Sequence, residues 1–546
     1  MAGHVFVVRS DLTRLACDAW LLPTDAFLVI EDAWRPALGD RRIDPPPGWR
    51  DGTRRVLPVD GTLPRLWLTN IAGRRAEDIG WHLDGVREWL VAAAADARQR
   101  GPAQRRGRPL LGLPVVATGA GGHADDKGEV TRRHLEMLHR EAPGLDVDVV
   151  LVTWHDRAFA AAQAARRALA ADLGVQRLWH GLSPVHLEAA AALAQRATAG
   201  ALVLFLGAGV SVGAGMPSWS ALLDDLAGDA GMAADERTAL TELEFTDQAR
   251  VIAGRLGPDV VSALVAERTR ADRWSLQHAL LAGLPAREAV TTNYDDLFER
   301  AVRDGARRPV RVLPHESAEA GEAWLLKLHG SVDHPEDIVL TRDDYMAYGA
   351  RRAALAGIVQ ALLITRHMLF VGFGLADPNF HRIVYEVRTA ARRPGGPGGT
   401  FGTALRLDAG GMAGELWKGD LDLIGFGGSA GRLEVFLDLL AHLANPGTAH
   451  LLDPAYGDLL TAGERDLAGL LADLAAQAGP DARGAPAWSA VERLLHDLGR
   501  PSPGRAGGRA PRADALHGVQ VLRDQVGDPP GGRHVVAIHD HHGAAL

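Results

Sequence analysis

Four short motifs in the middle of the chain combine residues that bind phosphate with residues that move protons. In the first, LVLFLGAGVSVGAGMPSW (residues 202–219), glycines at 207 and 209 directly follow a run of bulky apolar residues. Glycines let a backbone approach a ligand closely and point its N–H groups at a phosphate, and Ser211 adds a hydroxyl donor. Taken alone, the motif fits equally well a turn that only packs a helix on a strand.

The other three motifs carry an amide, a carboxylate, an imidazole and a second glycine turn. Asn293 and Asp295 lie two residues apart, and each could instead cap the helix that follows them. His329 could be a core histidine whose hydrogen bonds are satisfied. The three stretches are TTNYDDLFERA (291–301), LLKLHGSVD (325–333) and MLFVGFGLADPN (368–379).

Each of the four motifs follows a stretch that predicts a buried strand, and these stretches alternate with helical patterns. In an open parallel sheet the carboxyl ends of the strands gather at one edge, where ligands bind in a crevice. The four motifs should therefore converge, which favours a ligand site over four unrelated turns. The predicted strands are ALVLFLG, EAVTTN, AWLLKLHG, HMLFVGFG and LDLIGFG, and RLEVFLDLLAHLAN predicts a closing helix.

In this order the motifs resemble the NAD-binding core of the sirtuin superfamily, over residues 198–445. The resemblance implies an α/β fold, a doubly wound and mostly parallel Rossmann-like sheet. It assigns Asn293, Asp295 and His329 to catalysis. The residues assigned to NAD binding are Gly207, Ala208, Gly209 and Ser211 in the first glycine motif, Gly215, Met216 and Pro217 in the following turn, Thr292 beside Asn293, and Gly372, Gly374 and Asp377 in the second glycine motif.

Two departures from sirtuin deacylases argue against deacylation. Residues 330–371 contain no cysteine, so the four-cysteine zinc ribbon is missing, and we expect no zinc. Ser218, Trp219 and Ser220 stand where deacylases continue with Asp-Phe-Arg. With VLTRDDYMAY (339–348), the pattern is similar instead to a bacterial sirtuin-like branch that degrades NAD in anti-phage systems.

That resemblance implies an NAD+ hydrolase that yields nicotinamide and ADP-ribose and acts in anti-phage defence by depleting NAD. Asn293 would position the ribose and a water, Asp295 would accept a hydrogen bond from the carboxamide, and His329 would act as base. Two alternatives stay open. One is a module that binds NAD or ADP-ribose without turnover, and the other is a sirtuin-like protein ADP-ribosyltransferase or deacylase.

Residues 1–180 predict a second α/β domain, with strands at HVFVV, DAWLLP, RLWLTN, PLLGLPVV and VDVVLVTW. Asp11, Asp18 and Ala19 resemble the start of macro domains, which bind ADP-ribose, whereas Thr24 and Asp25 stand where asparagines are expected. The segment 114–130 would supply the glycine loop. An ADP-ribose-like nucleotide that activates the enzyme would bind here. An unrelated α/β domain explains the pattern equally well.

The bulk properties predict a cytoplasmic protein. The 546 residues carry a net charge of −9 and one cysteine, so neither a strong nucleic-acid signal nor a disulfide framework is present. The start lacks a signal-peptide pattern, and the apolar region 354–376 is interrupted by Arg366, which predicts a helix and a strand instead of a membrane span. We also expect a homo-oligomer, a helical extension over 446–498, and a partly disordered linker and tail over 499–546, whose His534, His539, His541 and His542 are more simply solvated than metal-bound.

Overall fold

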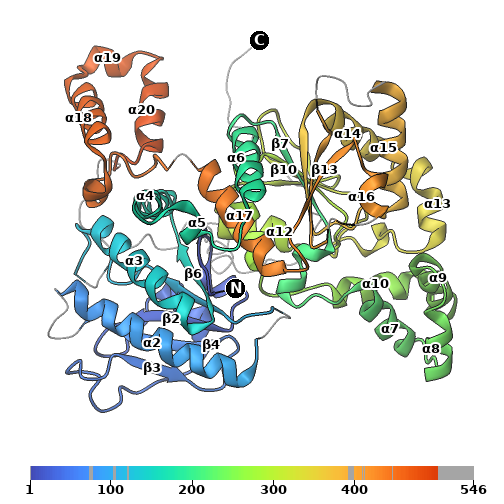
Figure 1. Ribbon diagram of the computed structural model, residues 1–546, viewed down its shortest axis with the longest axis horizontal. Helices are drawn as coiled ribbons and strands as arrows, with labels where there is room; N and C mark the ends of the chain where they lie inside the picture. The colour runs from blue at the N-terminus through green and yellow to red at the C-terminus, as the bar shows by residue number, and fades with distance from the viewer. Residues whose placement is uncertain are drawn as a thin grey trace, which may run out of the picture. The chain divides into compact units, whose positions relative to one another are not determined.

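The computed structural model describes residues 2–501, apart from 73–77, 103–105, 120–121, 392–398, 409, 411 and 446. Residues Met1–Arg500 form one compact unit. Two separate β-sheets, each flanked by helices, make up most of it (Figure 1). The predicted boundaries between domains stay predictions. The four histidines of the tail lie outside the described residues.

The first sheet has six strands in the order β1-β6-β5-β2-β4-β3. All neighbouring strands are parallel except β3, which runs antiparallel to β4 at one edge. All five strands predicted for this part of the chain are present. The strands are β1 (Val5–Arg9), β2 (Ala19–Thr24), β3 (Val56–Val59), β4 (Arg65–Asn70), β5 (Leu110–Pro114) and β6 (Asp148–Thr153).

The second sheet has seven strands, all parallel to their neighbours, in the order β13-β12-β11-β7-β8-β10-β9. From β7 the chain moves to one side through β8, and from β10 it returns to the other side at β11. This is the doubly wound α/β arrangement that the sequence predicts. The strands are β7 (Leu202–Leu206), β8 (Glu288–Thr291), β9 (Arg311–Leu313), β10 (Trp324–Lys327), β11 (His367–Val371), β12 (Gly402–Arg406) and β13 (Leu421–Gly425).

Helices connect and cover both sheets, and the predicted helical segments are present. The apolar region 354–376 contains most of a helix, α14, followed by a strand, β11, as predicted. Ser218 caps α7 through the N–H of Ala221, so the helix starts directly after the first glycine motif. The α-helices are α1 (Arg35–Leu38), α2 (Ile79–Arg100), α3 (Lys127–Leu145), α4 (Asp156–Leu173), α5 (Val175–Leu178), α6 (Pro184–Thr198), α7 (Trp219–Asp229), α8 (Ala234–Leu240), α9 (Phe245–Leu256), α10 (Pro258–Arg268), α11 (Leu276–Ala282), α12 (Leu297–Arg300), α13 (Arg342–Arg351), α14 (Ala353–Thr365), α15 (Pro378–Ala391), α16 (Met412–Leu416), α17 (Ala430–Ala444), α18 (Ala462–Gln477), α19 (Pro480–Gly484) and α20 (Trp488–Asp497).

Three strands were missed by sequence analysis, and each lacks a strong strand pattern. β3 contains Pro58 and lies at a sheet edge, where a missing N–H donor is tolerated. β9 is only three residues long and also lies at an edge. β12 begins with Gly402, where a Cβ would lie 2.2 Å from the carbonyl oxygen of Met368. Close packing against β11, which the sequence does not reveal, therefore requires that glycine.

One hydrophobic core cluster runs through both sheets. It includes Phe6 of β1, Leu204 of β7, and Leu280 and Phe436 of the intervening helices α11 and α17. Both α11 and α17 contact β1, and they contact each other. The two sheets therefore share apolar packing, and α17 takes part in the core of each half of the unit. Within the described part of the chain, none of the helices combines the length and the apolar character needed to cross a membrane.

A buried carboxylate on α17 ties this helix to the first half of the chain. Asp438 is fully buried and accepts hydrogen bonds from Nε2 of His4 at 2.9 Å, Nε1 of Trp179 at 2.7 Å and the guanidinium of Arg166 at 3.0 Å. These partners, above all the Arg166 charge, hold the pKa of the Asp438 carboxyl far below its ordinary value despite burial.

The first prediction concerns this carboxylate. Asp438→Ala leaves the buried Arg166 charge without its partner, so we expect a loss of about 3–5 kcal/mol in the free energy of unfolding. Chemical denaturation followed by circular dichroism measures the change. The control is Glu188→Ala on an exposed position of α6, for which we expect less than about 0.5 kcal/mol. Equal effects of the two substitutions would contradict this account of the network.

Candidate active site

The two glycine motifs meet at the point where the winding of the second sheet reverses direction. β7 and β11 are neighbours, so the loops that follow them begin side by side. The N–H of Gly207 donates to the carbonyl of Val371 at 3.0 Å, and the N–H of Gly209 donates to the carbonyl of Gly372 at 2.9 Å. Ligands of open α/β sheets bind at such reversal points, on the carboxyl edge of the strands.

Gly207 and Gly209 are needed for close contact between the loops that follow β7 and β11. A Cβ on Gly207 would lie 2.6 Å from the carbonyl oxygen of Gly372, and one on Gly209 would lie 2.7 Å from the Cα of Gly372. Their N–H groups are already bonded within the protein. The expectation that these N–H groups point at a phosphate is thus corrected: their glycine character serves close backbone packing. Gly374 has open space where a Cβ would stand, and therefore suits close approach by a ligand better.

The remaining residues of the first motif form the turn that leads into α7. Ala208 is exposed and begins a short 3-10 turn, and Gly215 adopts the left-handed conformation with φ of +86°. Met216 is buried in the core that both sheets share. Pro217 is half-buried. Contact of these residues with a dinucleotide stays a prediction.

The side chains of Ser211, Asn293 and Asp295 form one hydrogen-bonded cluster. Ser211 donates to Oδ2 of Asp295 at 2.8 Å, and Nδ2 of Asn293 donates to Oγ of Ser211 at 3.2 Å and to the carbonyl of Gly207 at 3.1 Å. The structure therefore brings the first glycine motif and the Asn/Asp pair together, as the sequence predicted. Thr292 joins by backbone alone, through its N–H to the carbonyl of Leu206 at 3.3 Å.

Asp295 also has the helix-capping role considered as an alternative. Its Oδ1 accepts from the N–H of Leu297 at 3.2 Å, at the start of α12. Burial raises the pKa of this carboxyl, while the Lys327 charge and the Ser211 hydrogen bond oppose the increase. Both carboxylate oxygens are thus bonded within the protein, and the group orients Ser211 whatever else it contacts.

Behind Ser211 lies a buried pair, Ser275 and His278, which belongs to none of the four sequence motifs. Ser275 caps α11, and its hydroxyl lies 2.8 Å from the carbonyl of Val210 and 2.8 Å from Nδ1 of His278. Burial lowers the pKa of His278 to about 3, so its imidazole is neutral at pH 7. The pair fixes the backbone of the glycine motif from a segment more than sixty residues away in sequence.

His329 follows β10 and lies beside an acidic residue of the second glycine motif. Its Nε2 is 3.6 Å from Oδ2 of Asp377, an ion-pair distance that is too long for a hydrogen bond. The same Asp377 oxygen accepts from the hydroxyl of Tyr345 at 3.1 Å, while Oδ1 accepts from the N–H of Phe380 at 2.8 Å. Asp377 is therefore held by α15 and Tyr345, and it faces His329. His329 is therefore not a core histidine with all its hydrogen bonds satisfied, because its Nε2 has no hydrogen-bond partner within the described part of the structure.

The electrostatic environment keeps His329 neutral. Burial lowers the pKa of its imidazole; the Asp377 carboxylate opposes this effect and the Arg352 charge adds to it. A neutral imidazole at pH 7 is able to accept a proton. The arrangement therefore suits a general base.

Three buried polar atoms in this region have no hydrogen-bond partner within the described part of the structure. They are Nε2 of His329, Oη of Tyr348 and Nδ2 of Asn379. The Tyr348 ring lies 6.0 Å from the His329 ring, and Asn379 is two residues after Asp377. Buried polar groups are nearly always paired, so such a group needs a partner that the protein does not supply. A polar ligand at the His329 edge would supply one.

Sequence analysis missed several residues of the site. Tyr345 and Tyr348 lie in the VLTRDDYMAY stretch, where their spacing alone assigns no role. Lys327 had a detectable signal, because a lysine inside the apolar strand LLKLHG is unusual. His278 had none, because only the fold brings it close to the motifs. Glu299 lies within the stretch 291–301, but only the fold brings it to Lys327.

The macro-like residues of the first sheet are engaged in local structure. Oδ1 of Asp11 accepts from the N–H of Thr13 at 2.8 Å, and Oδ2 of the buried Asp18 accepts from the N–H of Leu110 at 2.7 Å. Oδ1 of Asp25 accepts two N–H groups of the loop that follows β2. The Asp11 and Asp25 contacts lie at the carboxyl edge of the first sheet, whereas Asp18 lies at the amino ends of β2 and β5. Nucleotide binding at the carboxyl edge stays a prediction.

Comparison with known proteins identifies the class of this domain. Residues 287–400 match the model of the SIR2-like domain. This span includes Asn293, His329 and the second glycine motif, whereas the first glycine motif lies before it. The chain thus contains a sirtuin-like domain, as the motifs predicted. Across the described residues, no group of three or more His, Cys, Asp and Glu side chains is arranged to hold a metal ion.

Curated proteins are similar in sequence to about a third of this chain. NAD(+) hydrolase ThsA of Bacillus cereus (strain MSX-D12) is 30% identical over 197 residues, 35% of this chain and 40% of that protein. NAD(+) hydrolase ThsA of Enterococcus faecium is 31% identical over 200 residues, 35% of this chain and 41% of that protein. Defense-associated sirtuin 2 of Bacillus subtilis is 28% identical over 203 residues, 35% of this chain and 19% of that protein. The matches span about two fifths or less of the relatives' length.

The second prediction separates the glycines that pack the loops from the one that borders open space. Gly207→Ala forces a Cβ onto the backbone of Gly372, and we expect a loss of about 1–3 kcal/mol in the free energy of unfolding. Gly374→Ala meets no atom within 4 Å and should leave the melting temperature unchanged. Thermal unfolding of both variants measures this. A tolerated Gly207→Ala would show that the two loops are less closely packed than described.

Proposed function

We propose that this protein hydrolyses NAD+ at the bond between nicotinamide and ribose, giving nicotinamide and ADP-ribose. The observation that carries the proposal is the joining of Asn293 and Asp295 to the first glycine motif through Ser211, with His329 and Asp377 on neighbouring loops. The similarity to two proteins named NAD(+) hydrolase, over a third of the chain, supports it.

The reaction needs little acid catalysis. The C1′–N bond of the ribose breaks, its electron pair goes to the positively charged nicotinamide nitrogen, and the transition state resembles an oxocarbenium ion. Water adds to C1′ and loses one proton. The site must therefore hold the dinucleotide, place a water and accept that proton.

We assign these tasks to three side chains. The anchored Nδ2 of Asn293 leaves its amide oxygen to accept a hydrogen bond from the water or a ribose hydroxyl. His329 accepts the proton, held beside Asp377. The Asp295 carboxylate, which already binds Ser211 and the start of α12, uses a remaining lone pair for the carboxamide. Gly374 and the unpartnered Tyr348 and Asn379 atoms border the dinucleotide.

We further propose that the first half of the chain binds an ADP-ribose-like nucleotide that controls hydrolysis, and that NAD depletion serves anti-phage defence. The name of the Bacillus subtilis relative supports the role in defence. Two contacts support control. The Arg307 guanidinium lies 3.6 Å above the Trp154 ring, which follows β6, and Nε1 of Trp274 donates to Oγ of Ser10 at 3.0 Å. A ligand at the carboxyl edge of the first sheet would therefore lie near the segment that follows α12.

The third prediction tests the reaction itself. Purified protein should release nicotinamide from NAD+, and Asn293→Ala and His329→Ala should each reduce kcat by at least about 100-fold, because each removes a group that acts on the water. Chromatography of the products measures this, with and without ADP-ribose-like nucleotides. NAD binding without release by the wild type would favour the binding module, and label transfer to protein would favour the transferase.

The fourth prediction follows from the lowered pKa of His329. The base is active when neutral, so kcat/KM should stay level as the pH falls from 8 to below the ordinary histidine value of about 6.5, and decrease only at lower pH. Because Asp377 raises this pKa, Asp377→Asn should move the acid limb to still lower pH. A shift toward higher pH would contradict the assignment of His329 and Asp377.

A further inference from the structure

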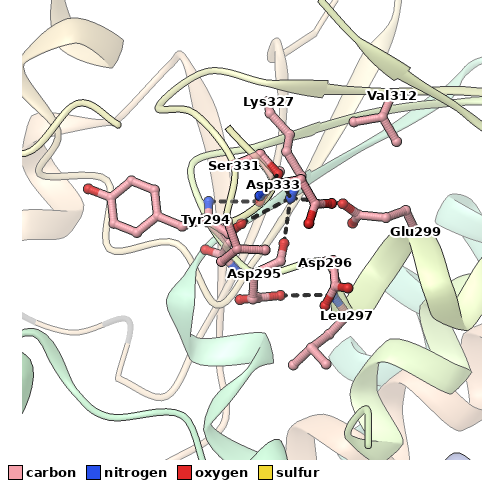
Figure 2. A network of polar contacts seen from close by, with 12 residues as sticks. Tyr294, Asp295, Asp296, Leu297, Glu299, Val312, Lys327, Ser331 and Asp333 are labelled. Carbon is pink, nitrogen blue, oxygen red and sulfur yellow. Dashed lines mark hydrogen bonds and ion pairs between the residues drawn. The ribbon is translucent and has the colours of Figure 1, made fainter. Parts of the chain in front are cut away.

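The last residue of β10 is a fully buried lysine that contacts both catalytic loops. Lys327 is 0% exposed. Its Nζ lies 2.5 Å from the carbonyl oxygen of Asp295, 3.1 Å from that of Tyr294 and 3.4 Å from Oγ of Ser331. Figure 2 shows this ammonium group between the backbone of the Asn293 loop and the carboxylate of Glu299, which lies 2.8 Å away.

Such a group is too costly to bury for packing alone. An ammonium without water needs a counter-charge and acceptors for its three N–H bonds. Glu299 of α12 supplies the charge, and the two backbone carbonyls supply acceptors. Burial raises the pKa of Glu299, and the Lys327 charge opposes this increase. An apolar residue would fill the same strand position without any of these requirements.

The position of Lys327 couples the two loops that we assign to catalysis. It lies two residues before His329 on one continuous backbone. Its backbone acceptors are the carbonyl groups of the two residues directly after Asn293. The N–H of Val332 also donates to the carbonyl of Tyr294 at 2.9 Å, so the loops keep a backbone connection without the lysine. The ammonium group is therefore not needed to connect the two loops, but it sets the distance between them.

We propose that Lys327 is a positioning residue: held by Glu299, it fixes the backbone of residues 293–295 relative to His329, so that the water on Asn293 lies within reach of the base. The proposal rests on the proposed hydrolysis of NAD+. A displacement of about 1 Å at a reacting centre costs on the order of 100-fold in rate, so loss of this spacing should lower kcat more than it raises KM.

The test separates positioning from stability with a paired substitution. Lys327→Met alone leaves Glu299 buried without a partner and should lower both the melting temperature and kcat. Lys327→Met combined with Glu299→Leu removes both charges, a replacement that often restores stability. We expect the double variant to regain most of the melting temperature, yet to keep kcat at least tenfold below the wild type with KM within threefold. Recovery of kcat along with stability would overturn the proposal.

A destabilised variant far from the site is the matched control. Leu138 is fully buried on α3 in the first half of the chain. Leu138→Ala should lower the melting temperature as Lys327→Met does, while kcat per folded molecule stays at the wild-type value. A tenfold decrease of kcat in this control would assign the effect of Lys327→Met to stability and overturn the proposal.

Hydrogen exchange makes the test independent of catalysis. In the double variant, amides of residues 292–299 should exchange at least tenfold faster than in the wild type, whereas those of α3 should not change. Unchanged exchange over 292–299 would overturn the proposal even if the protein released no nicotinamide. Absence of nicotinamide release by the wild type, with faster exchange in the variant, would instead reject the proposed function and leave Lys327 as a determinant of loop position.

Discussion

Direct backbone contact between the loops after β7 and β11 is the constraint on which the site depends. Because Gly207, Gly209 and Gly372 lack side chains, these loops approach to hydrogen-bonding distance, and each buries part of the other. The carbonyl of Gly207 then accepts from Asn293, and Ser211 reaches Asp295. A single close approach therefore orders three of the four motifs, and the candidate site is built outward from it.

Most strands of the second sheet could be predicted from the sequence, because a parallel strand buried on both faces has a continuous run of apolar residues. The convergence of the motifs also followed, since carboxyl ends of parallel strands share an edge. β12 and Lys327 show the limit. Gly402 and Lys327 are unfavourable in a buried strand by composition, and only their neighbours, the backbone of Met368 and the carbonyls near Asn293, explain them.

The meeting of the motifs was predictable from the sequence, whereas the contacts of each residue depend on segments that are distant in the chain. The glycines at 207 and 209 were assigned to phosphate and turn out to pack against another loop. Asp377 was assigned to the dinucleotide and also faces His329. His278 is brought to Ser211 across 67 residues, at 3.5 Å. The types and spacing of residues indicate which reaction a site could catalyse. Hydrogen-bond partners that are distant in sequence determine which atoms of those residues remain free to contact a ligand.

Ionisation of some buried carboxylates stabilises the fold, as for Asp438, whereas ionisation of others, such as Asp295 and Glu299, destabilises it. The pKa of Asp438 is lower in the folded protein than in the unfolded chain. Its carboxylate therefore contributes to folding stability above the unfolded pKa near 4, and this contribution is lost as the pH falls toward the folded pKa. Asp295 and Glu299 have raised pKa values, so their ionisation opposes folding as the pH rises above that value. The site therefore contains charges that the fold tolerates at a cost, whereas Asp438 of α17 contributes stability of the opposite sign. Burial also raises the pKa of Glu434 on the same helix, so the sign depends on the partners of each carboxylate and not on the helix that carries it. Buried carboxylates with such a cost are expected where polar groups are kept for chemistry, as we propose for Asp295.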